Sequence, residues 1–416
     1  MRIKTCFLAA AISLAVLVPA AQAQKFSIIH QFDHANGAYP LAPLIADAAG
    51  NLYGTTFYGG NSNYYGTVYK LSPTGKETAF VSFDQSNGAG PDFGNLLPDG
   101  QGNLYGTSLV GGDLTCQSPP GAGCGTVFKI DRSGKQTVLY AFTQQDGQNP
   151  FAGLVRDDSG NLLGTTTTGP GLSQNGTVFE VNPATGQQTI VYAFGDLPDG
   201  QYPEAGLIAD GQGNFYGTTA FGGAAGGNCF NSGCGTVFEL SSNGQGGFSE
   251  SVLYSFVGGT DGSDPHGLIR DAAGNLYGTT YIGGNFLCYN GAGCGTVFKL
   301  SPNGGGSWTE TILYRFAGFP GSDGANPWGG LARDASGNLY GTTLWGGGST
   351  ACPISGCGTV YRLDPAGHET VLHSFSVTDG AYPYAGLLLN QESKAIYGTA
   401  ATGGGPGQGI VFKITP

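Results

Sequence analysis

The reactive side chains that stand out first are cysteines: besides Cys6 in the N-terminal apolar run, eight of the nine occur as four close pairs. The pairs are Cys116/Cys124, Cys229/Cys234, Cys288/Cys294 and Cys352/Cys357. A zinc site would need thiolates that converge four at a time and is typically built from C-x-x-C pairs, which this sequence lacks. The spacing favours four disulfides, each stabilising the fold by about 2–2.5 kcal/mol in the chain-entropy model. Such bonds persist in oxidising compartments.

A second set of candidates consists of variable side chains that follow either a recurring proline or a recurring Y-G-T-T motif. After the proline stand Leu41, Asp92-Phe93, Phe151, Glu204, His266, Trp328 and Tyr384. Aromatic side chains in such loops suit stacking on sugar rings or contact with a protein partner, whereas the alternative is simple packing. The candidates for ligand binding are Tyr58, Phe151, Glu204, Phe221, His266, Tyr281, Trp328, Trp345 and Tyr384.

The first residue of each D/N-G-x-x-P segment, four residues before the recurring proline, could be a metal ligand. Five copies carry an aspartate and two an asparagine: Asp146, Asp199, Asp261, Asp323, Asp379, Asn36 and Asn87. Calcium needs six to eight oxygens at one point, whereas this pattern supplies one carboxylate per copy. Asp-Gly followed by Pro is itself a turn signal. The pattern therefore favours turn capping, and we predict no metal and no cofactor.

The five histidines do not form a catalytic pattern in the sequence. His30 and His373 occupy a position that is tyrosine in four other copies, and His368 lies in a turn. His34 and His266 stand alone in their loops. The sequence contains no G-x-S-x-G elbow, no H-E-x-x-H helix and no phosphate-binding loop. No catalytic residue is assigned, although active sites assembled from distant loops leave no such motif.

The elements that position these residues follow from an internal repeat. The D/N-G-x-x-P segment occurs seven times, ending at Pro40, Pro91, Pro150, Pro203, Pro265, Pro327 and Pro383. Each copy continues with a G-L-x-x-D-x-x-G-N-L-Y-G-T-T-like stretch, as at Gly267–Thr280, then with G-T-V-F-K-L, as at Gly125–Ile130. A T-V-L-Y-x-F stretch closes the unit, as at Thr137–Phe142.

Each copy predicts four short strands, because its apolar runs are rich in Val, Thr, Leu, Tyr and Phe and are bounded by turn residues. One four-stranded meander would leave both faces wet, but copies packed around an axis bury them. We therefore predict an all-β, seven-bladed β-propeller. The chain is 416 residues long with 77 glycines and 22 prolines, which fits many tight turns and excludes a helical or disordered protein.

The two ends of the repeat array predict how the ring closes. Residues 25–32 resemble the fourth strand of the other copies, while the last copy stops after its third strand at Ile414. We expect 25–32 to be the outer strand of blade 7. The blades are expected at approximately 40–83, 91–142, 150–194, 203–256, 265–316, 327–375 and 383–415 within a single domain, 24–416.

The repeat unit resembles the GloVer tandem repeat of exported bacterial proteins and, more distantly, NHL-like and streptogramin-lyase-like propeller repeats. The resemblance covers all seven copies. It implies export and a propeller-like repeat, often with a C-terminal surface anchor, and no assigned activity. This chain ends at Pro416, directly after a strand, so we expect no such anchor. The streptogramin-lyase-like comparison does not extend to a catalytic histidine arrangement.

The first 23 residues predict a secretory signal peptide, with Arg2 and Lys4 before an apolar run and Ala21-Gln22-Ala23 as the cleavage site. The run is too short to span a membrane, so no membrane insertion is expected. The net charge of −12, with few and dispersed basic residues, argues against nucleic-acid binding. We expect an exported monomer, extracellular or periplasmic.

Three functional classes are compatible with the sequence. The first is a binding module with a glycan or an extracellular protein on the aromatic loop face. The second is a structural or adhesive surface protein, in which the repeats and the disulfides would themselves serve the function. The third is an extracellular polysaccharide lyase or lactone hydrolase that would use His266 or Glu204.

Overall fold

The structure is a computed structural model that describes residues 24–416 apart from 61–62, 117–120, 171–174, 225–228, 230–231, 244–246, 289–290, 319–322 and 353–355. The expected signal peptide, 1–23, lies outside the described residues. Every named element is a β-strand. Among the described residues we find no helix long and apolar enough to cross a membrane.

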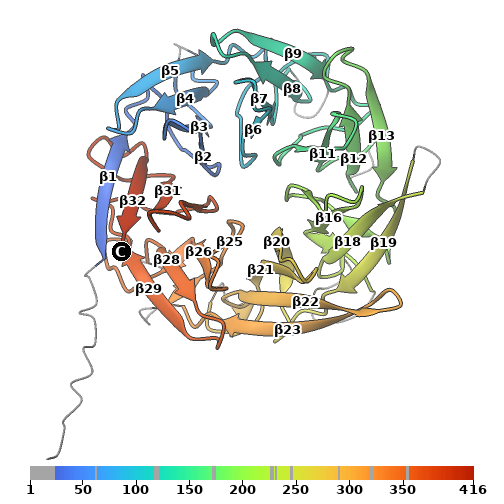
Figure 1. Cartoon of the computed structure of the whole chain (residues 1–416), viewed down its shortest axis with the longest axis vertical. Helices are drawn as coiled ribbons and strands as arrows, with labels where there is room; N and C mark the ends of the chain where they lie inside the picture. Colours follow the sequence, from blue (N-terminus) through green and yellow to red (C-terminus); the bar gives the residue numbers. More distant parts are fainter. Residues whose placement is uncertain are drawn as a thin grey trace, which may run out of the picture.

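Seven four-stranded antiparallel sheets stand as blades around one axis, which confirms the predicted propeller (Figure 1). The inner strands, from blade 1 to blade 7, are β2 (Ile45–Ala46), β6 (Leu97–Pro98), β10 (Val155–Arg156), β15 (Ile208–Ala209), β20 (Ser263–Arg270), β25 (Ala332–Arg333) and β30 (Leu388–Leu389). The second strands are β3 (Leu52–Thr56), β7 (Leu104–Ser108), β11 (Leu162–Thr166), β16 (Phe215–Thr219), β21 (Leu276–Ile282), β26 (Leu339–Thr343) and β31 (Ile396–Ala400).

The outer half of each blade carries the third and fourth strands. The third strands are β4 (Thr67–Leu71), β8 (Thr126–Ile130), β12 (Thr177–Val181), β18 (Thr236–Ser242), β22 (Thr296–Gly304), β28 (Thr359–Leu363) and β32 (Ile410–Thr415). The fourth strands are β5 (Glu77–Ser82), β9 (Gln136–Ala141), β13 (Gln188–Ala193), β19 (Phe248–Ser255), β23 (Ser307–Arg315), β29 (Glu369–Ser374) and, for blade 7, β1 (Lys25–Gln31).

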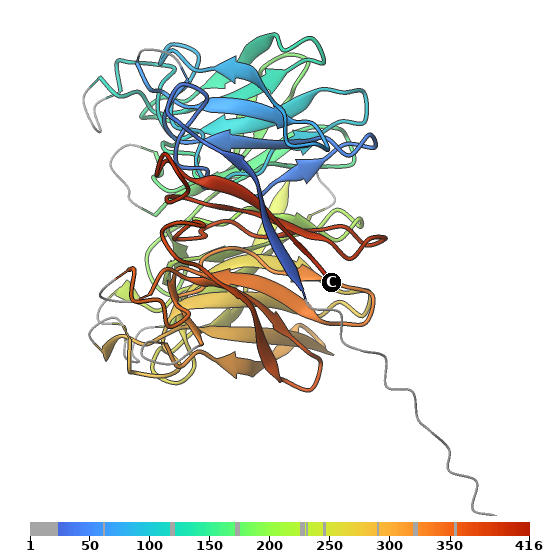
Figure 2. The same ribbon diagram turned by 90° about the vertical axis from the view of Figure 1, so that its left-hand side faces the viewer.

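The N-terminal strand closes the ring, as the sequence predicts. β1 pairs antiparallel with β32 from Lys25↔Thr415 to Gln31↔Ile410, and the two lie side by side in Figures 1 and 2. Its register shifts between Ile28 and His30. The third and fourth strands of the other six blades shift at the equivalent place, which is Val127/Phe128 in blade 2. β1 therefore repeats the geometry of a fourth strand in detail.

One aromatic pair recurs at every junction between blades. The phenylalanine after each fourth strand packs edge-to-face on the aromatic ring of the next blade's third strand, with centroids 4.9–5.3 Å apart. Phe32 and Tyr69 form this pair at the closing junction, both fully buried. The glycine of Y-G-T makes room for the ring, because a Cβ on Gly278 would lie 2.6 Å from Phe298. The core therefore consists of seven equivalent interfaces, each packed between two neighbouring blades.

The link into each inner strand and the loop after each second strand emerge on one face of the ring, where they pair. Antiparallel bridges join them in all seven blades, including the small sheets β14 (Gly200–Gln201) with β17 (Phe221–Gly222) and β24 (Gly324–Ala325) with β27 (Trp345–Gly346). We call this side the loop face. The fourth-to-first-strand link and the second-to-third-strand loop therefore share one end of every blade.

The residue before each recurring proline adopts a left-handed conformation. Its φ is 56–58° in all seven blades, although only Gly90 is a glycine. The others are Tyr39, Asn149, Tyr202, Asp264, Asn326 and Tyr382. Each of the seven backbone N–H groups donates to a carbonyl of the preceding blade at 2.7–3.0 Å. This bond holds a strained residue in place and fixes where the segment after the proline points.

The acidic residues of the D/N-G-x-x-P segments cap turns. Asp199 accepts from the backbone N–H of Gly195 at 2.7 Å and from the hydroxyl of Tyr192 at 2.8 Å. Asp146, Asp261 and Asp323 accept the same pair of bonds in their blades. Asp379 instead pairs with His373, which replaces the tyrosine. The turn interpretation of this column is confirmed.

The four predicted disulfides are present. They join Cys116 to Cys124, Cys229 to Cys234, Cys288 to Cys294 and Cys352 to Cys357, with Cα–Cα distances of 4.9–5.6 Å. The second cysteine of each pair supplies the carbonyl that accepts the blade-to-blade hydrogen bond described above. The disulfides therefore brace the loop face beside the segments that enter the inner strands.

Candidate functional site

The segments that follow the recurring prolines converge on one cavity at the centre of the loop face. The cavity has a volume of ≈ 270 Å³, and every blade contributes to its wall. Six wall residues belong to the variable column of the repeat: Leu41, Phe93, Glu204, His266, Trp328 and Tyr384. Glycine and alanine backbone of the inner segments forms much of the remaining wall. A small pocket therefore lies on the propeller axis, and the side chains that line it differ from blade to blade.

Aromatic rings meet across the axis at this cavity. Phe93 of blade 2 lies 4.7 Å from Phe151, 5.6 Å from Trp328 and 5.6 Å from Tyr384, measured between ring centroids. Tyr281 joins the group at 5.2 Å from Trp328. All five rings are half-buried. They pack on one another and remain partly exposed, so packing and contact with a ligand are compatible roles.

The nine candidates from the sequence separate into two groups. Phe151, Glu204, His266, Tyr281, Trp328 and Tyr384 gather at the central cavity. Tyr58, Phe221 and Trp345 instead pack against the left-handed tyrosines Tyr39, Tyr202 and Tyr382. The second group occupies the position two residues after the last threonine of its strand, whereas Tyr281 lies one residue after it. Side chains alternate along a strand, so these two positions point to different sides.

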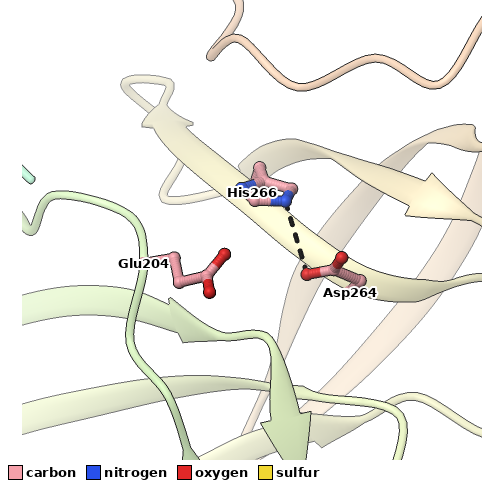
Figure 3. Close-up of side chains that lie close together, drawn as sticks. All are labelled: Glu204, Asp264 and His266. Carbon is pink, nitrogen blue, oxygen red and sulfur yellow. Dashed lines mark ion pairs between the residues drawn. The ribbon is translucent and has the colours of Figure 1, made fainter. Parts of the chain in front are cut away.

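An acidic and imidazole cluster lies in the wall between blades 4 and 5. Glu204 precedes β15, and Asp264 and His266 both belong to β20 (Figure 3). His266 Nε2 lies 3.3 Å from Asp264 Oδ1 as an ion pair. One ligand atom from each of the three side chains lies within 4.8 Å of the others. In Figure 3 the carboxylate of Glu204 points toward this pair.

A local irregularity of the repeat builds this cluster. In most copies three residues separate the recurring proline from the leucine of the G-L-x-x-D-like stretch, as between Pro203 and Leu207. Only two residues separate Pro265 from Leu268. The inner strand of blade 5 consequently pairs with β21 from Ser263 onward, and His266 pairs with Thr279. Other inner strands contain only two residues. The shorter segment draws His266 into the blade, where it is 3% exposed.

The protonation of the cluster reflects burial and its neighbours. Burial alone would lower the pKa of His266, but the nearby charges of Asp264 and then of Glu204 outweigh it, so the pKa is raised. Burial raises the pKa of Glu204 to about 7, with His266 opposing the shift and Asp264 adding to it. A carboxyl group with a raised pKa and an imidazole with a raised pKa therefore lie side by side in the wall of the cavity.

A further buried carboxyl, Asp92, comes from the other irregular copy. Blade 2 has one residue more than most copies between its proline and leucine, and Asp92 directly follows Pro91. Its side chain is 6% exposed, and Oδ1 has no hydrogen-bond partner among the described residues. Burial and then the charge of Glu204 raise its pKa well above the usual range. No lysine or arginine is among the described residues that line the cavity.

Sequence reasoning missed Asp264 as part of this site. The signal for it is the column before the recurring proline, which contains tyrosine, asparagine or glycine in six copies and a charged residue only in blade 5. For Asp92, the sequence signal is the one additional residue between proline and leucine in blade 2. The turn aspartates, which the sequence offers as metal ligands, accept hydrogen bonds from backbone N–H groups instead.

The sequence matches the Gloeobacter/Verrucomicrobia repeat over residues 16–118, 114–318 and 287–416. The chain belongs to the Gloeobacter/Verrucomicrobia repeat family. This confirms the resemblance seen in the repeat unit, and the matched ranges together include all seven blades of the family's repeat. No curated protein matches the sequence.

Solved structures with a similar fold share little sequence with this member of the Gloeobacter/Verrucomicrobia repeat family. PorZ, a surface component of the type-IX secretion system of Porphyromonas gingivalis, is 13% identical with a TM-score of 0.53, over 91% of this chain and 46% of PorZ. A puromycin-hydrolyzing peptidase of Mycobacterium tuberculosis is 10% identical with a TM-score of 0.51, over 87% and 48%. A gluconolactonase of Xanthomonas campestris is 16% identical with a TM-score of 0.42, over 76% and 83%. The chain spans about half the length of PorZ and of the peptidase, and the likeness to these two proteins concerns the fold alone.

Proposed function

We propose that this protein is an exported binding module that takes a terminal sugar residue of an extracellular glycan into the central cavity. The observation that carries the proposal is the convergence of Trp328, Tyr384 and Phe93 with Glu204 and His266 on one cavity. Partly exposed aromatic rings offer the flat apolar surface on which sugar rings stack. The carboxylate and imidazole groups beside them offer hydrogen-bond partners for hydroxyl groups.

The size of the cavity favours a small group over a protein surface. A volume of ≈ 270 Å³ is just below the range of about 300–1,000 Å³ for drug-sized ligands, so one ring is a better fit than a long segment. Protein partners need about 800 Å² of contact on each side, most of which would lie outside this recess. A purely apolar ligand would leave the buried acidic groups unpaired, which is costly.

Export is part of the proposal and rests on two independent features. Four disulfides on the loop face suit an oxidising compartment. The first 23 residues have the composition of a signal peptide. In an exported position the loop face would meet glycans of the cell's surroundings.

Replacing Trp328 with leucine tests the proposal, because blade 1 already has Leu41 in the same column and the variant keeps an apolar residue there. In a glycan-array screen followed by calorimetry on the best glycan, Trp328→Leu is expected to weaken binding at least about tenfold. Removing an aromatic ring on which a nucleobase stacks costs roughly 1–3 kcal/mol, and we expect a similar loss for a stacked sugar ring. Loss of the ring removes the stacking surface and leaves the acidic groups.

Trp345→Leu is the matched control, since Trp345 lies on the same face but packs on Tyr382 rather than on the cavity. It is expected to bind glycan like the wild type. Equal weakening by both substitutions, or no binding to any glycan by the wild type, would contradict the proposal. Retained glycan binding in both variants would place the binding surface elsewhere and contradict it as well.

A second candidate is acid–base chemistry on the bound sugar, as in a polysaccharide lyase or a lactone hydrolase. Glu204, with a pKa of about 7, titrates where general acids and bases operate best, and the imidazole of His266 lies beside it in the cavity wall. Product formation from a bound oligosaccharide or a sugar lactone, abolished in Glu204→Gln, would favour this candidate. Binding without turnover would favour the binding module.

A further inference from the structure

We propose that Glu204, Asp264 and His266 bind one divalent transition-metal cation, of the Zn²⁺ or Mn²⁺ type, at a site that is open toward the central cavity. The three side chains come from two neighbouring blades and meet in the cavity wall (Figure 3). The site binds the cation by itself. Its contribution to glycan binding rests on the proposed function.

The positions of the ligand atoms fit a single cation. Tetrahedral sites with bonds of about 2.0–2.2 Å place neighbouring ligand atoms roughly 3.3–3.6 Å apart. His266 Nε2 and Asp264 Oδ1 are already 3.3 Å apart. The Glu204 carboxylate lies within 4.8 Å of both and points toward them, so a rotation about its side-chain bonds completes the set.

Burial gives a second reason to place a ligand here. His266 is 3% exposed, and neither its Nε2 nor Asp264 Oδ1 makes an aligned hydrogen bond within the described part of the chain, although the two form an ion pair. Buried polar atoms left without such a partner cost about 1–3 kcal/mol each. A cation between the two atoms would engage a lone pair on each and remove that cost.

Backbone hydrogen bonds fix the positions of Asp264 and His266 before a cation binds. Asp264 has a φ of 57°, and its N–H donates to the carbonyl of Cys234 at 3.0 Å, next to the Cys229–Cys234 disulfide. His266 is paired to Thr279 within the sheet. Two of the three ligands thus stand on rigid backbone, so little conformational entropy is lost when a cation binds.

The donor set selects the type of cation. Imidazole suits Zn²⁺ and other first-row transition metals, whereas Ca²⁺ and Mg²⁺ prefer six or more oxygen ligands. Two carboxylates compensate the charge of a divalent ion, and no basic side chain is among the described cavity-lining residues. Three protein ligands leave a fourth position open, as in sites that bind a further ligand. Glu204 and His266 line the cavity, so that position faces it.

The test is a calorimetric titration of ZnCl₂, and separately of MnCl₂, into oxidised protein that has been freed of metal with a chelator and then of the chelator. We expect saturable binding of one equivalent of at least one of the two cations. Asp264→Asn and Glu204→Gln should each weaken it by at least about tenfold, since even indirect ligand partners are worth 10–100-fold. Asn149 and Asn326 hold the Asp264 position in other blades with φ 58°, so Asp264→Asn is compatible with the fold.

His368→Ala is the matched control, because it removes an exposed histidine whose Nδ1 lies 3.1 Å from Asp364. This variant should keep wild-type affinity. No one-to-one binding of either cation, unchanged affinity in both cluster variants, or an equal loss in His368→Ala would each overturn the proposal.

The same titration separates this inference from the glycan proposal. Trp328→Leu leaves all three ligands in place and should retain the cation while losing glycan. If the cation binds but no glycan does, the metal site stands and the glycan function fails. If glycan binding survives in chelated protein and no cation binds, the reverse holds.

Discussion

At the scale of single residues, the site depends on departures from a repeat that is otherwise regular. His266 lies in the copy that is one residue short, and Asp92 in the copy that is one residue long. Asp264 is the only charged member of the left-handed column, and its backbone is fixed by a carbonyl that belongs to a disulfide cysteine. A repeat makes scaffold positions redundant, so a change in one copy can be specialised without loss of the fold.

Removing the Cys229–Cys234 disulfide should therefore affect the site as well as stability. The double variant Cys229→Ala/Cys234→Ala should lose about 2 kcal/mol of unfolding free energy. It should also weaken Zn²⁺ binding several-fold, because the loop that carries the carbonyl bonded to Asp264 is no longer closed. Urea unfolding and the titration above measure the two effects.

Cys352→Ala/Cys357→Ala is the control for this comparison, since it opens a loop of the same sequence separation, 5, in blade 6. Its carbonyl contacts Tyr382, away from the cluster. A similar loss of stability with unchanged Zn²⁺ affinity is expected. Equal effects of the two double variants on affinity would show that Cys234 does not position Asp264.

At the scale of the elements, four of the seven fourth strands carry a glutamate in the same column, near the blade before it. Glu77, Glu250, Glu310 and Glu369 lie at or near the start of the pairing between third and fourth strands, each with one buried oxygen that has no hydrogen-bond partner among the described residues. Burial raises the pKa of all four to about 7. For the last three, the charge of the preceding blade's turn aspartate adds to this shift.

Stability should consequently fall as pH rises through the range between about 4.5 and 7. Within it the folded protein holds protons on these glutamates that the unfolded chain has lost, so folding is favoured at the acidic end and the gain disappears above pH 7. The midpoint of thermal unfolding should be lower at about pH 8 than at about pH 5.

The variant Glu250→Gln/Glu310→Gln/Glu369→Gln should have a shallower pH dependence over this range. Gln136 and Gln188 occupy the same column in blades 2 and 3, so glutamine is compatible with the site. His30 and His373, whose pKa values burial lowers, contribute the opposite slope in both proteins and cancel in the difference. Identical pH profiles for the two proteins would refute a role for the column.

At the scale of the whole molecule, the ring is closed by a junction equivalent to the other six. Phe32 after β1 packs on Tyr69 with centroids 5.0 Å apart, and Phe142 packs on Phe179 at 4.9 Å inside the ring. All four rings are fully buried. Since the cavity wall includes residues of blades 1 and 7, closure also fixes the shape of the central site.

Phe32→Leu and Phe142→Leu should therefore cost similar free energies of unfolding, about 1–2 kcal/mol each, because each loses one edge-to-face pair and some packing volume. Urea unfolding followed by circular dichroism gives both values. A full cost for Phe142→Leu with none for Phe32→Leu would mean that the N-terminal strand is not part of the folded ring.

Much of the architecture follows from the sequence because the local signals for strands and turns recur in all seven copies of the repeat. Glycine of Y-G-T, the turn aspartates and the paired cysteines predict strands, turns and disulfides by local chemistry, which acts over a few residues. The unpaired strand expected at 25–32 predicts closure because only the last copy lacks its fourth strand, and the structure pairs Lys25–Gln31 with it. Local rules repeated around an axis leave few other topologies.

The site could be predicted only in part, because its members are brought together by the ring. Glu204 and His266 were candidates from the sequence, but their proximity to Asp264 depends on how two blades pack. The separation of Trp328 from Trp345 depends on which side of a strand each faces and which segments cross the axis. The sequence alone determined seven blades, their closure and their disulfides. The tertiary structure decided which variable residues share the cavity, because distances across the axis are set by the packing of all blades together.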